Sequence, residues 1–348
     1  MAVLARDVAI SWSGAVNTVI KVLFVCPHWE KQHSPDGIPV CIKQQATALN
    51  GTGKVRAQIK TVQTGSNPMN YLLAWARFHL QSQILTAHDL VHCHWGYLPL
   101  VVFPSAKPVI VTLHGGDVYE HRNNRRLIKY RERLVGIVTK YCARRALRVI
   151  AVSKHLGTQL GGIPFKVIPN GVDPSLFYPM DQQLARRTLG LPAHKKIVLF
   201  GAAPENRVKN FALAKIVCCL SRERPMLLTL NGVPHEKVAT YMNASDALLL
   251  TSYREGSPDV VKEALACGLP VLSVDVGDVA ERTHSLSGCK VVQSYDPKVL
   301  SEELDIMFSS RKRISVSIAD LDQTNTTANL LSIYNEALSI QSSGVEGH

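Results

Sequence analysis

Two glutamates lie eight positions apart, Glu255 and Glu263, in the segment EGSPDVVKE. Glu255 follows an apolar run that is typical of a buried strand, and Glu263 falls in a helical pattern. At helical spacing Glu263 projects away from the buried stripe of its helix, on the side of Asp259. Both carboxylates can therefore flank the start of one helix. On spacing alone, an exposed helix glutamate and a capping glutamate remain an open alternative.

The turn between the two glutamates predicts an anion site. With Ser257 as N-cap, Pro258 falls at the first helical position, where its missing N–H costs nothing. The amides of Asp259 and Val260 then have no acceptor within the helix. These amides and the helix dipole favour a phosphate. Because carboxylates repel phosphate, we expect the flanking glutamates to bind hydroxyl groups, such as those of a sugar.

Further candidates follow other apolar runs. Arg207 and Lys209 lie in a polar loop before a helix, where two cations could hold a diphosphate and a solvated loop is the alternative. His114 ends a run and is followed by two glycines, which permit close backbone approach, although a core histidine is equally compatible. His92 and His94 share one strand face. That spacing could suit a metal, but no carboxylate lies nearby in the sequence, and we interpret the pair as structural or substrate-lining.

Common nucleotide motifs are absent from the sequence. The segment GTGK at 51–54 lacks the spacing of a P-loop. No G-x-G-x-x-G follows an apolar run, which argues against a nicotinamide or flavin enzyme. No G-x-S-x-G is present, so the serine nucleophile elbow is excluded as well.

The elements that must position these residues alternate along the chain. Continuous apolar runs separated by helical patterns predict parallel sheets covered on both faces. The pattern occurs twice, so we expect two Rossmann-like doubly wound domains, with ligands at the carboxyl ends of the strands. The predicted seam lies in 173–196. The predicted strands are 21–26, 89–94, 108–115, 148–153, 196–203, 226–232, 247–252, 270–275 and 290–292.

Composition bounds the class of protein. The 348 residues are 46% hydrophobic, ample for two domains, and no run approaches the roughly 20 apolar residues of a membrane span. Residues 1–20 lack the pattern of a signal peptide and are interpreted as an extension. The eight cysteines show no C-x-x-C spacing. Free thiols in a reducing cytosol are therefore expected.

The net charge of +12 is concentrated in the first half of the chain. Residues 1–175 hold 21 Lys and Arg against 8 Asp and Glu. Ten of these cations lie in 121–148, together with a single glutamate. We expect an apolar stripe there to pack on the first sheet and the cations to lie against an anionic membrane, with a solvated face as the alternative. The stripe comprises Leu127, Leu134, Val138 and Tyr141.

Taken together, four segments resemble the retaining glycosyltransferases of family 4, which have the two-domain GT-B fold. They are EGSPDVVKEALACGLPV, the Arg207/Lys209 loop, TLHGGD, and VIAVSKHL with VIPNGVDPSLF. The resemblance runs from about 21 to 340. It implies a first domain over 21–175, a nucleotide-sugar domain over 176–325 and a helix over 326–340 that crosses back to the first domain, the two domains facing across a cleft.

The resemblance also implies residue roles. Glu255 would bind the donor sugar, Glu263 the ribose of the nucleotide, and Lys209 the diphosphate. His114 would lie near the transferred sugar, and the remaining donor-binding residues would be Gly37, Arg207, Gly256, Ser257, Asp259 and Val260. The chain departs from the family pattern in the Ser-Pro after Gly256, in Asp259 where asparagine is frequent, in a single glycine at Gly37, and in Arg207, which is a looser match than Lys209.

The implied activity is retaining transfer from a UDP- or GDP-sugar to a hydroxyl of a glycan or lipid-linked acceptor. Neither a metal nor a cofactor is expected, nor is nucleic acid as a partner. The implied location is the cytoplasm, with peripheral association at the inner face of the membrane. Two alternatives stay open: a basic nucleic-acid-binding protein, and a GT-B protein that binds sugar nucleotides without transfer, including an epimerase-like one.

Overall fold

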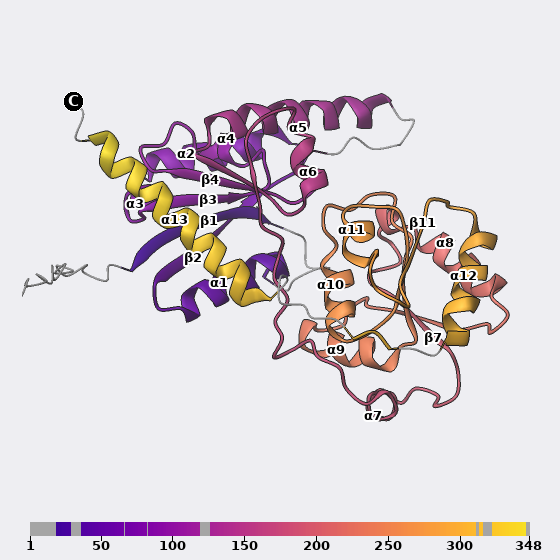
Figure 1. Ribbon diagram of the computed structural model, residues 1–348. Helices are drawn as coiled ribbons and strands as arrows, with labels where there is room; N and C mark the ends of the chain where they lie inside the picture. The colour runs from indigo at the N-terminus through magenta and orange to yellow at the C-terminus, as the bar shows by residue number, and fades with distance from the viewer. Residues whose placement is uncertain are drawn as a thin grey trace, which may run out of the picture.

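The computed structural model describes residues 19–28, 36–65, 67–81, 83–118, 126–310, 313–315 and 322–345. Within these ranges the chain forms two α/β units (Figure 1). One contains a sheet of order β2-β1-β3-β4-β5-β6, and the other a sheet of order β11-β10-β9-β7-β8. Every pair of neighbouring strands is parallel. The prediction of two doubly wound parallel sheets is confirmed.

The strands are short, apolar and mostly buried. The first sheet contains β1 (Ile20–His28), β2 (Val55–Gln63), β3 (Leu90–His94), β4 (Val109–Leu113), β5 (Arg148–Ala151) and β6 (Lys166–Val167). The second contains β7 (Ile197–Phe200), β8 (Met226–Thr229), β9 (Ala247–Leu250), β10 (Val271–Val274) and β11 (Lys290–Val292). Each strand predicted from an apolar run is present.

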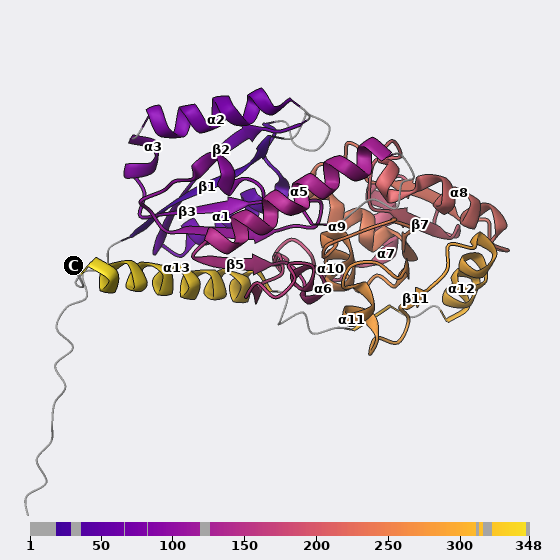
Figure 2. The same ribbon diagram turned by 90° about the horizontal axis from the view of Figure 1, so that it is seen from above.

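Helices cover both faces of the first sheet (Figures 1 and 2). Two of them, α1 (Val40–Gly51) and α13 (Gln323–Val345), pack on one face. The other face is covered by α2 (Pro68–Leu80), α4 (Pro99–Val102), α5 (Arg126–Arg145) and α6 (Lys154–Thr158), while α3 (Gln83–Thr86) follows α2. The continuous apolar character of the strands follows from this double cover.

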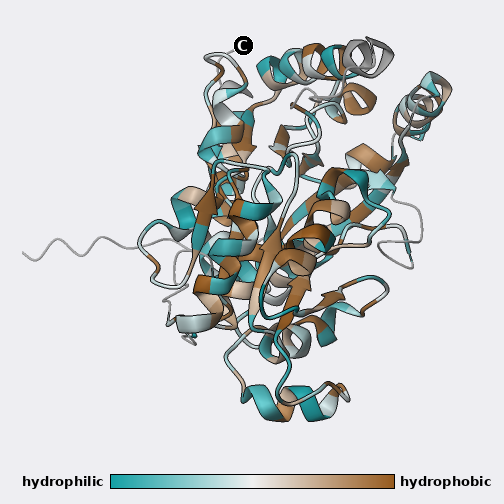
Figure 3. Ribbon diagram, turned by 90° about the vertical axis from the view of Figure 1, so that its right-hand side faces the viewer, coloured by the Kyte–Doolittle hydropathy of each residue, from teal (hydrophilic) through white to brown (hydrophobic). Residues whose placement is uncertain are grey.

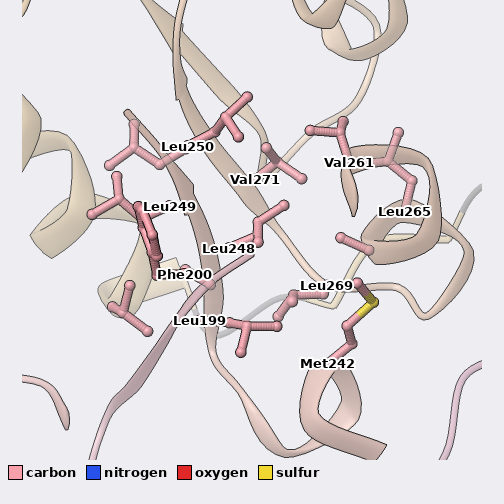
Figure 4. Close-up of a cluster of buried hydrophobic side chains, with 14 of the residues drawn as sticks. Leu199, Phe200, Met242, Leu248, Leu249, Leu250, Val261, Leu265, Leu269 and Val271 are labelled. Carbon is pink, nitrogen blue, oxygen red and sulfur yellow. The ribbon is translucent and has the colours of Figure 1, made fainter. Parts of the chain in front are cut away.

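The second unit has its own core. Its helices are α7 (Gln182–Thr188), α8 (Phe211–Leu220), α9 (His235–Ala244), α10 (Asp259–Ala266), α11 (Val279–Thr283) and α12 (Pro297–Ser310), with the 3₁₀ turn η1 (Arg207–Lys209) before α8. Side chains of β7, β9 and β10 meet those of α9 and α10 in one buried cluster (Figure 4). Figure 3 shows the same layering, with apolar strands inside helices that carry polar residues.

The two edge strands of the first sheet, β2 and the two-residue β6, were missed from the sequence. The strand β2 pairs only with β1. In its sequence, VRAQIKTVQ, apolar residues alternate with polar ones, and most of its side chains are at least partly exposed. An edge strand with one wet face shows no continuous apolar run, which is the pattern used to find the others.

The last helix returns to the first unit. Gln323 donates its amide to the Val172 carbonyl at 3.0 Å, and Val172 and Asp322 form a parallel bridge. From there α13 runs across the first sheet (Figure 1), burying Ile333 and Tyr334 among the strands. The helix predicted over 326–340 thus spans Gln323–Val345. The exact domain borders stay predictions, and residues 1–18 lie outside the described part of the chain.

The predicted apolar stripe of the basic segment is wrong for Leu134, which is 43% exposed, and for Tyr141, which is 45% exposed, whereas Val138 is partly buried. The buried side chains of α5 are Thr139, Cys142 and Ala143. The helix packs against α4, and Thr139 donates to the Asp117 carbonyl in the loop after β4 at 2.9 Å. Leu127 and its neighbours through 131 have no described side chains. None of the helices in the described ranges has the length and apolar content of a membrane span.

Candidate functional site

The carboxyl ends of the two sheets meet at an interdomain junction. Ser153, after β5, donates its Oγ to the Gly256 carbonyl at 2.8 Å, and both groups are buried. A Cβ built on Gly256 would lie 2.5 Å from the His114 carbonyl oxygen. Only glycine therefore permits this contact between the strand ends of the first sheet and the loop after β9. The site predicted from the sequence lies at this junction.

Helix α10 begins one residue later than predicted. Pro258 has an extended backbone (ψ 114°) and is itself the N-cap, so Asp259 and Val260 are the first two helical residues. Ser257 does not cap, because its buried Oγ donates to Asp278 Oδ2 at 2.8 Å. The amides of Asp259 and Val260 still stand at the helix start, without intrahelical acceptors. The amides on which the predicted anion site depends are therefore at the helix start, and the Ser257 hydroxyl supports the loop instead of capping the helix.

Glu255 and Lys209 form an ion pair at this helix start. Lys209 Nζ lies 2.7 Å from Glu255 Oε1, with both side chains largely buried. Thr251 at the end of β9 holds the lysine backbone by donating to the Lys209 carbonyl at 3.0 Å. The two residues, 46 positions apart, are brought together because β7 and β9 are neighbours. Arg207 is exposed in η1 and makes no ion pair within the described ranges.

Glu263 is hydrogen-bonded to a residue that the sequence did not indicate. His235, the first residue of α9, lies with Nε2 3.0 Å from Glu263 Oε1. Burial opposes the charged imidazole, but the hydrogen bond and charge of Glu263 prevail and raise the pKa of His235. Gln44 of α1 reaches the same imidazole at 3.4 Å. Glu263 therefore lies at the junction. In the sequence it follows the first residue of α10, whereas Glu255 precedes it.

The negative charge of Asp259 is neutralised locally. Lys262, whose side chain is fully buried, places Nζ 2.7 Å from Asp259 Oδ1 and 3.0 Å from the Asn170 carbonyl. Asn170 donates its side-chain amide to the same carboxylate at 3.1 Å. Burial works against ionisation, yet Lys262 and Asn170 hold the pKa of Asp259 below its usual value. Lys262 and Asn170 lie in segments that carry the family resemblance, but the sequence analysis gave neither residue a role.

His114 lies next to two further histidines, His92 and His94. Its Nε2 lies 3.2 Å from Nδ1 of His94, and its ring stacks on Trp95 at 4.4 Å. Burial lowers the pKa of His114 to about 4 and that of His92 to about 3. All three imidazoles are therefore neutral at pH 7. His92 and His94 share one strand face as predicted, with ring centroids 4.3 Å apart.

The loop after β4 is organised by Asp117, which sequence reasoning did not single out. This fully buried carboxylate accepts the amides of Gly96 at 2.7 Å and Gly115 at 2.8 Å. Burial raises the pKa of Asp117, although these amides favour its charged form. Its position three residues after His114 was the available signal, since short loops often bend around an aspartate that accepts nearby amides.

Gly37 follows β1 in the chain and lies against His28, at the carboxyl ends of the strands of the first sheet. His114 lies at the same end of that sheet. The Gly37 φ of 72° and the His28 ring, 2.1 Å from a built Cβ, both require glycine. Its predicted contact with a donor stays a prediction, and residues 29–35 lie outside the described part. Within that part, no three His, Cys, Asp or Glu side chains are grouped so as to hold a metal ion.

Comparison with known families covers both units. Residues 19–176 match the model of Glycosyltransferase Family 4, and residues 224–316 match the model of Glycosyl transferases group 1. The first match ends at the chain crossing between the units, and the second contains both glutamates. The chain belongs to the GT-B glycosyltransferases of the family 4 type.

Curated relatives agree with this class. TuaC of Bacillus subtilis, named as a teichuronic acid biosynthesis glycosyltransferase, is 31% identical over 220 residues, which are 55% of this chain and 54% of TuaC. A D-inositol 3-phosphate glycosyltransferase of Nocardiopsis dassonvillei is 26% identical over 310 residues, 71% of this chain and 70% of that one. The chain spans about half the length of the first curated relatives it matches.

Solved structures share the fold. Sucrose-phosphate synthase from Thermosynechococcus elongatus superposes with a TM-score of 0.72 at 16% identity, over 92% of this chain and 100% of that one. HepE from Anabaena, solved with UDP and glucose, gives a TM-score of 0.68 at 16% identity, over 91% of this chain and all of HepE. The predicted GT-B fold is confirmed. The comparisons do not favour a nucleic-acid-binding protein.

Proposed function

We propose that this protein transfers a sugar from a nucleotide-diphosphate sugar to a hydroxyl of an acceptor, with retention at the anomeric carbon. The observation that carries the proposal is the Lys209–Glu255 pair, 2.7 Å apart at the start of α10, beneath the His114 loop of the other sheet. A cation, helix amides and a carboxylate are thereby gathered where two strand ends meet. This is the combination that a diphosphate joined to a sugar requires.

Each residue has a role in this proposal. The amides of Asp259 and Val260 and the ammonium of Lys209 bind the diphosphate and stabilise the charge that develops as it departs. Glu255, released from Lys209, accepts hydrogen bonds from the sugar, and Glu263 accepts those of the ribose. These protein cations and amides supply the charge stabilisation, so we propose that the transfer is metal-independent.

We propose a same-face course for the transfer, without a covalent intermediate. Glu255 is held on the lysine side of the α10 start, and we assign it to hydroxyl binding, not to covalent attack. The bond from the anomeric carbon to the phosphate oxygen breaks, and the acceptor oxygen bonds to the same face. The acceptor proton passes to the departing phosphate oxygen, so no protein base is consumed.

The acceptor is proposed to be a glycan or lipid-linked saccharide at a membrane surface. On the sheet face covered by α2, α4 and α5, large apolar side chains point outward, and α4 contacts both other helices. They include Leu73 of α2, which is 61% exposed, and Ile137 of α5, which is 57% exposed. Exposed cations, among them Arg144, accompany them. Apolar and cationic groups on one face are suited to an anionic membrane, at about 1 kcal/mol per basic residue near the surface.

Vesicle binding tests the membrane part. The protein should sediment with anionic phosphatidylglycerol vesicles and not with neutral ones at low salt, and the binding should weaken as salt rises. Ile137→Glu should reduce binding, while Ile306→Glu serves as control because Ile306 is equally exposed (63%) on α12 of the second unit. Equal recovery with neutral and anionic vesicles would reject a membrane role for this face.

A screen of nucleotide sugars tests the activity. Thermal shifts with UDP-, GDP-, ADP- and CMP-sugars should single out one nucleotide, and that donor should be consumed with release of its nucleoside diphosphate. Release of the nucleotide only when an acceptor is present supports transfer. Binding with epimerisation and no transfer would support an epimerase-like protein instead, and no binding by any donor would reject the proposal.

A further inference from the structure

A buried chain of histidines lies behind the junction. His92 of β3 is held by two hydroxyls, since its Nδ1 lies 2.7 Å from Tyr334 Oη and its Nε2 2.7 Å from Thr112 Oγ1. His94 stacks on His92 and is fully buried. Its Nδ1 lies 3.2 Å from Nε2 of His114, a partly exposed residue whose backbone carbonyl is in contact with Gly256 at the junction. His94 thus connects the core of the first unit to His114.

The Nε2 nitrogen of His94 has no partner among the residues that the structure describes. It is buried and makes no hydrogen bond there. A charged His94 would leave an N–H at this position, and burial together with the neighbouring His92 and His114 lowers the pKa of His94 well below its usual value. Two neutral tautomers remain. One places the proton on Nε2, leaving an unpaired N–H in the core, and the other places it on Nδ1, leaving only an unpaired lone pair.

The second tautomer is favoured on physical grounds. Unpaired buried N–H groups are rarer in proteins than under-used acceptors, because a buried donor without a partner loses its full solvation. Both tautomers keep the hydrogen bond between His94 and His114 and differ only in its direction, so the unpaired group at His94 Nε2 decides between them. His94 therefore donates from Nδ1 to Nε2 of His114.

We propose that His94 is a positioning residue that fixes the tautomer of His114. Because Nε2 of His114 accepts this hydrogen bond, its proton must reside on Nδ1. His114 Nδ1 makes no hydrogen bond within the described residues, and the side chain is partly exposed. His114 then presents an N–H to the junction. Resting on the proposed function, this makes His114 a hydrogen-bond donor to an oxygen of the transferred sugar and not a proton acceptor.

The tautomers can be read directly, with no need for activity. Two-bond ¹⁵N–¹H correlation spectra at pH 7 of ¹⁵N-histidine-labelled protein distinguish the two forms, and the His94→Phe and His114→Ala spectra assign the signals among the 13 histidines. We expect protonated Nδ1 in both His94 and His114. In His94→Phe, the His114 signal should change to the other tautomer or to a mixture. A protonated Nε2 on His94 in the unaltered protein would overturn the assignment.

Kinetics then test the positioning role. His94→Phe should lower kcat/KM by about 2- to 10-fold, the range expected for losing one net hydrogen bond. In a His114→Ala background the same substitution should have no further effect, whereas a purely structural role would persist there. His88→Phe is the matched control, because His88 is also buried and hydrogen-bonded but precedes β3 at its opposite end.

The outcomes separate the two proposals. An equal loss from His94→Phe in both backgrounds, or in step with His88→Phe, would overturn the positioning role. If the predicted tautomers are found in a protein that binds and transfers no sugar, the tautomer assignment is supported and the proposed function fails. Thermal unfolding of each variant shows whether a loss reflects misfolding, and the spectrum of His94→Phe still reports the His114 tautomer.

Discussion

Gly256→Ala tests the contact that joins the two sheets. The added methyl carbon would lie 2.5 Å from the His114 carbonyl oxygen, and ordinary contact begins near 3.4 Å. The loop and the strand end must therefore separate by about 0.9 Å. Both groups are backbone, so no side-chain rotation relieves the overlap. A shift of this size along the contact would also stretch the 2.8 Å hydrogen bond from Ser153 beyond useful length.

The expected loss is large in activity and small in stability. Misplacing a reacting group by 1 Å can lower the rate by about 100-fold, so we expect kcat/KM with the identified donor to fall by about that factor, or about 2.7 kcal/mol. The melting temperature should change little, because the two units can part while each core stays intact. Gly51→Ala is the control, since a Cβ there meets no atom within 4 Å. An unchanged kcat/KM in Gly256→Ala would refute the reasoning.

Four further outcomes are expected. Lys209→Ala should reduce kcat at least tenfold, about 1.4 kcal/mol, because the lysine stabilises the departing diphosphate. Lys215→Ala, on the exposed side of α8, is the control and should leave kcat unchanged. A kcat of Lys209→Ala equal to that of the unaltered protein would remove Lys209 from the mechanism. Glu263→Ala should weaken donor binding in calorimetry, and an unchanged Kd would argue against a ribose contact. The raised pKa of His235 means that its pairing stabilises the fold below pH 6.5 and is lost as pH rises through the folded-state pKa, so melting curves of His235→Gln should diverge from wild type on the acid side. Asp259→Asn should tighten binding of nucleoside diphosphate, because it leaves the Lys262 ammonium without its carboxylate and makes the helix start more positive, and weaker binding would contradict that electrostatic argument.

The parts of the fold that could be predicted are those with local signals. Buried strands appear as apolar runs, and the turn after β9 combines Ser257 and Pro258 with two glutamates. The edge strand β2, which has one face exposed to solvent, has no continuous apolar run. In α5 the apolar residues at helical spacing, including Leu134 and Tyr141, were predicted to be buried. In the structure the small residues Thr139, Cys142 and Ala143 take the buried positions instead, which periodicity alone does not reveal.

The parts of the site that could not be predicted depend on long-range contacts. His235 meets Glu263 across 28 positions, and Asn170 meets Asp259 across 89. His235 belongs to no local motif, and the segment that contains Asn170 does not indicate its partner, so only the fold shows that both lie at the junction. Ser257 shows a related error, because the aspartate that binds its hydroxyl lies 21 positions later and outcompetes the cap.

The return of α13 has a consequence for how the chain matures. Tyr334 and its neighbours complete the apolar layer beneath β1, β3 and β4, yet they follow the whole second unit in the chain and leave the ribosome after it. Until then α1 is the one helix, among those described, that covers this layer. The first unit is thus completed only after the second has been made, and a nascent chain halted before residue 330 would expose an apolar surface to chaperones and proteases.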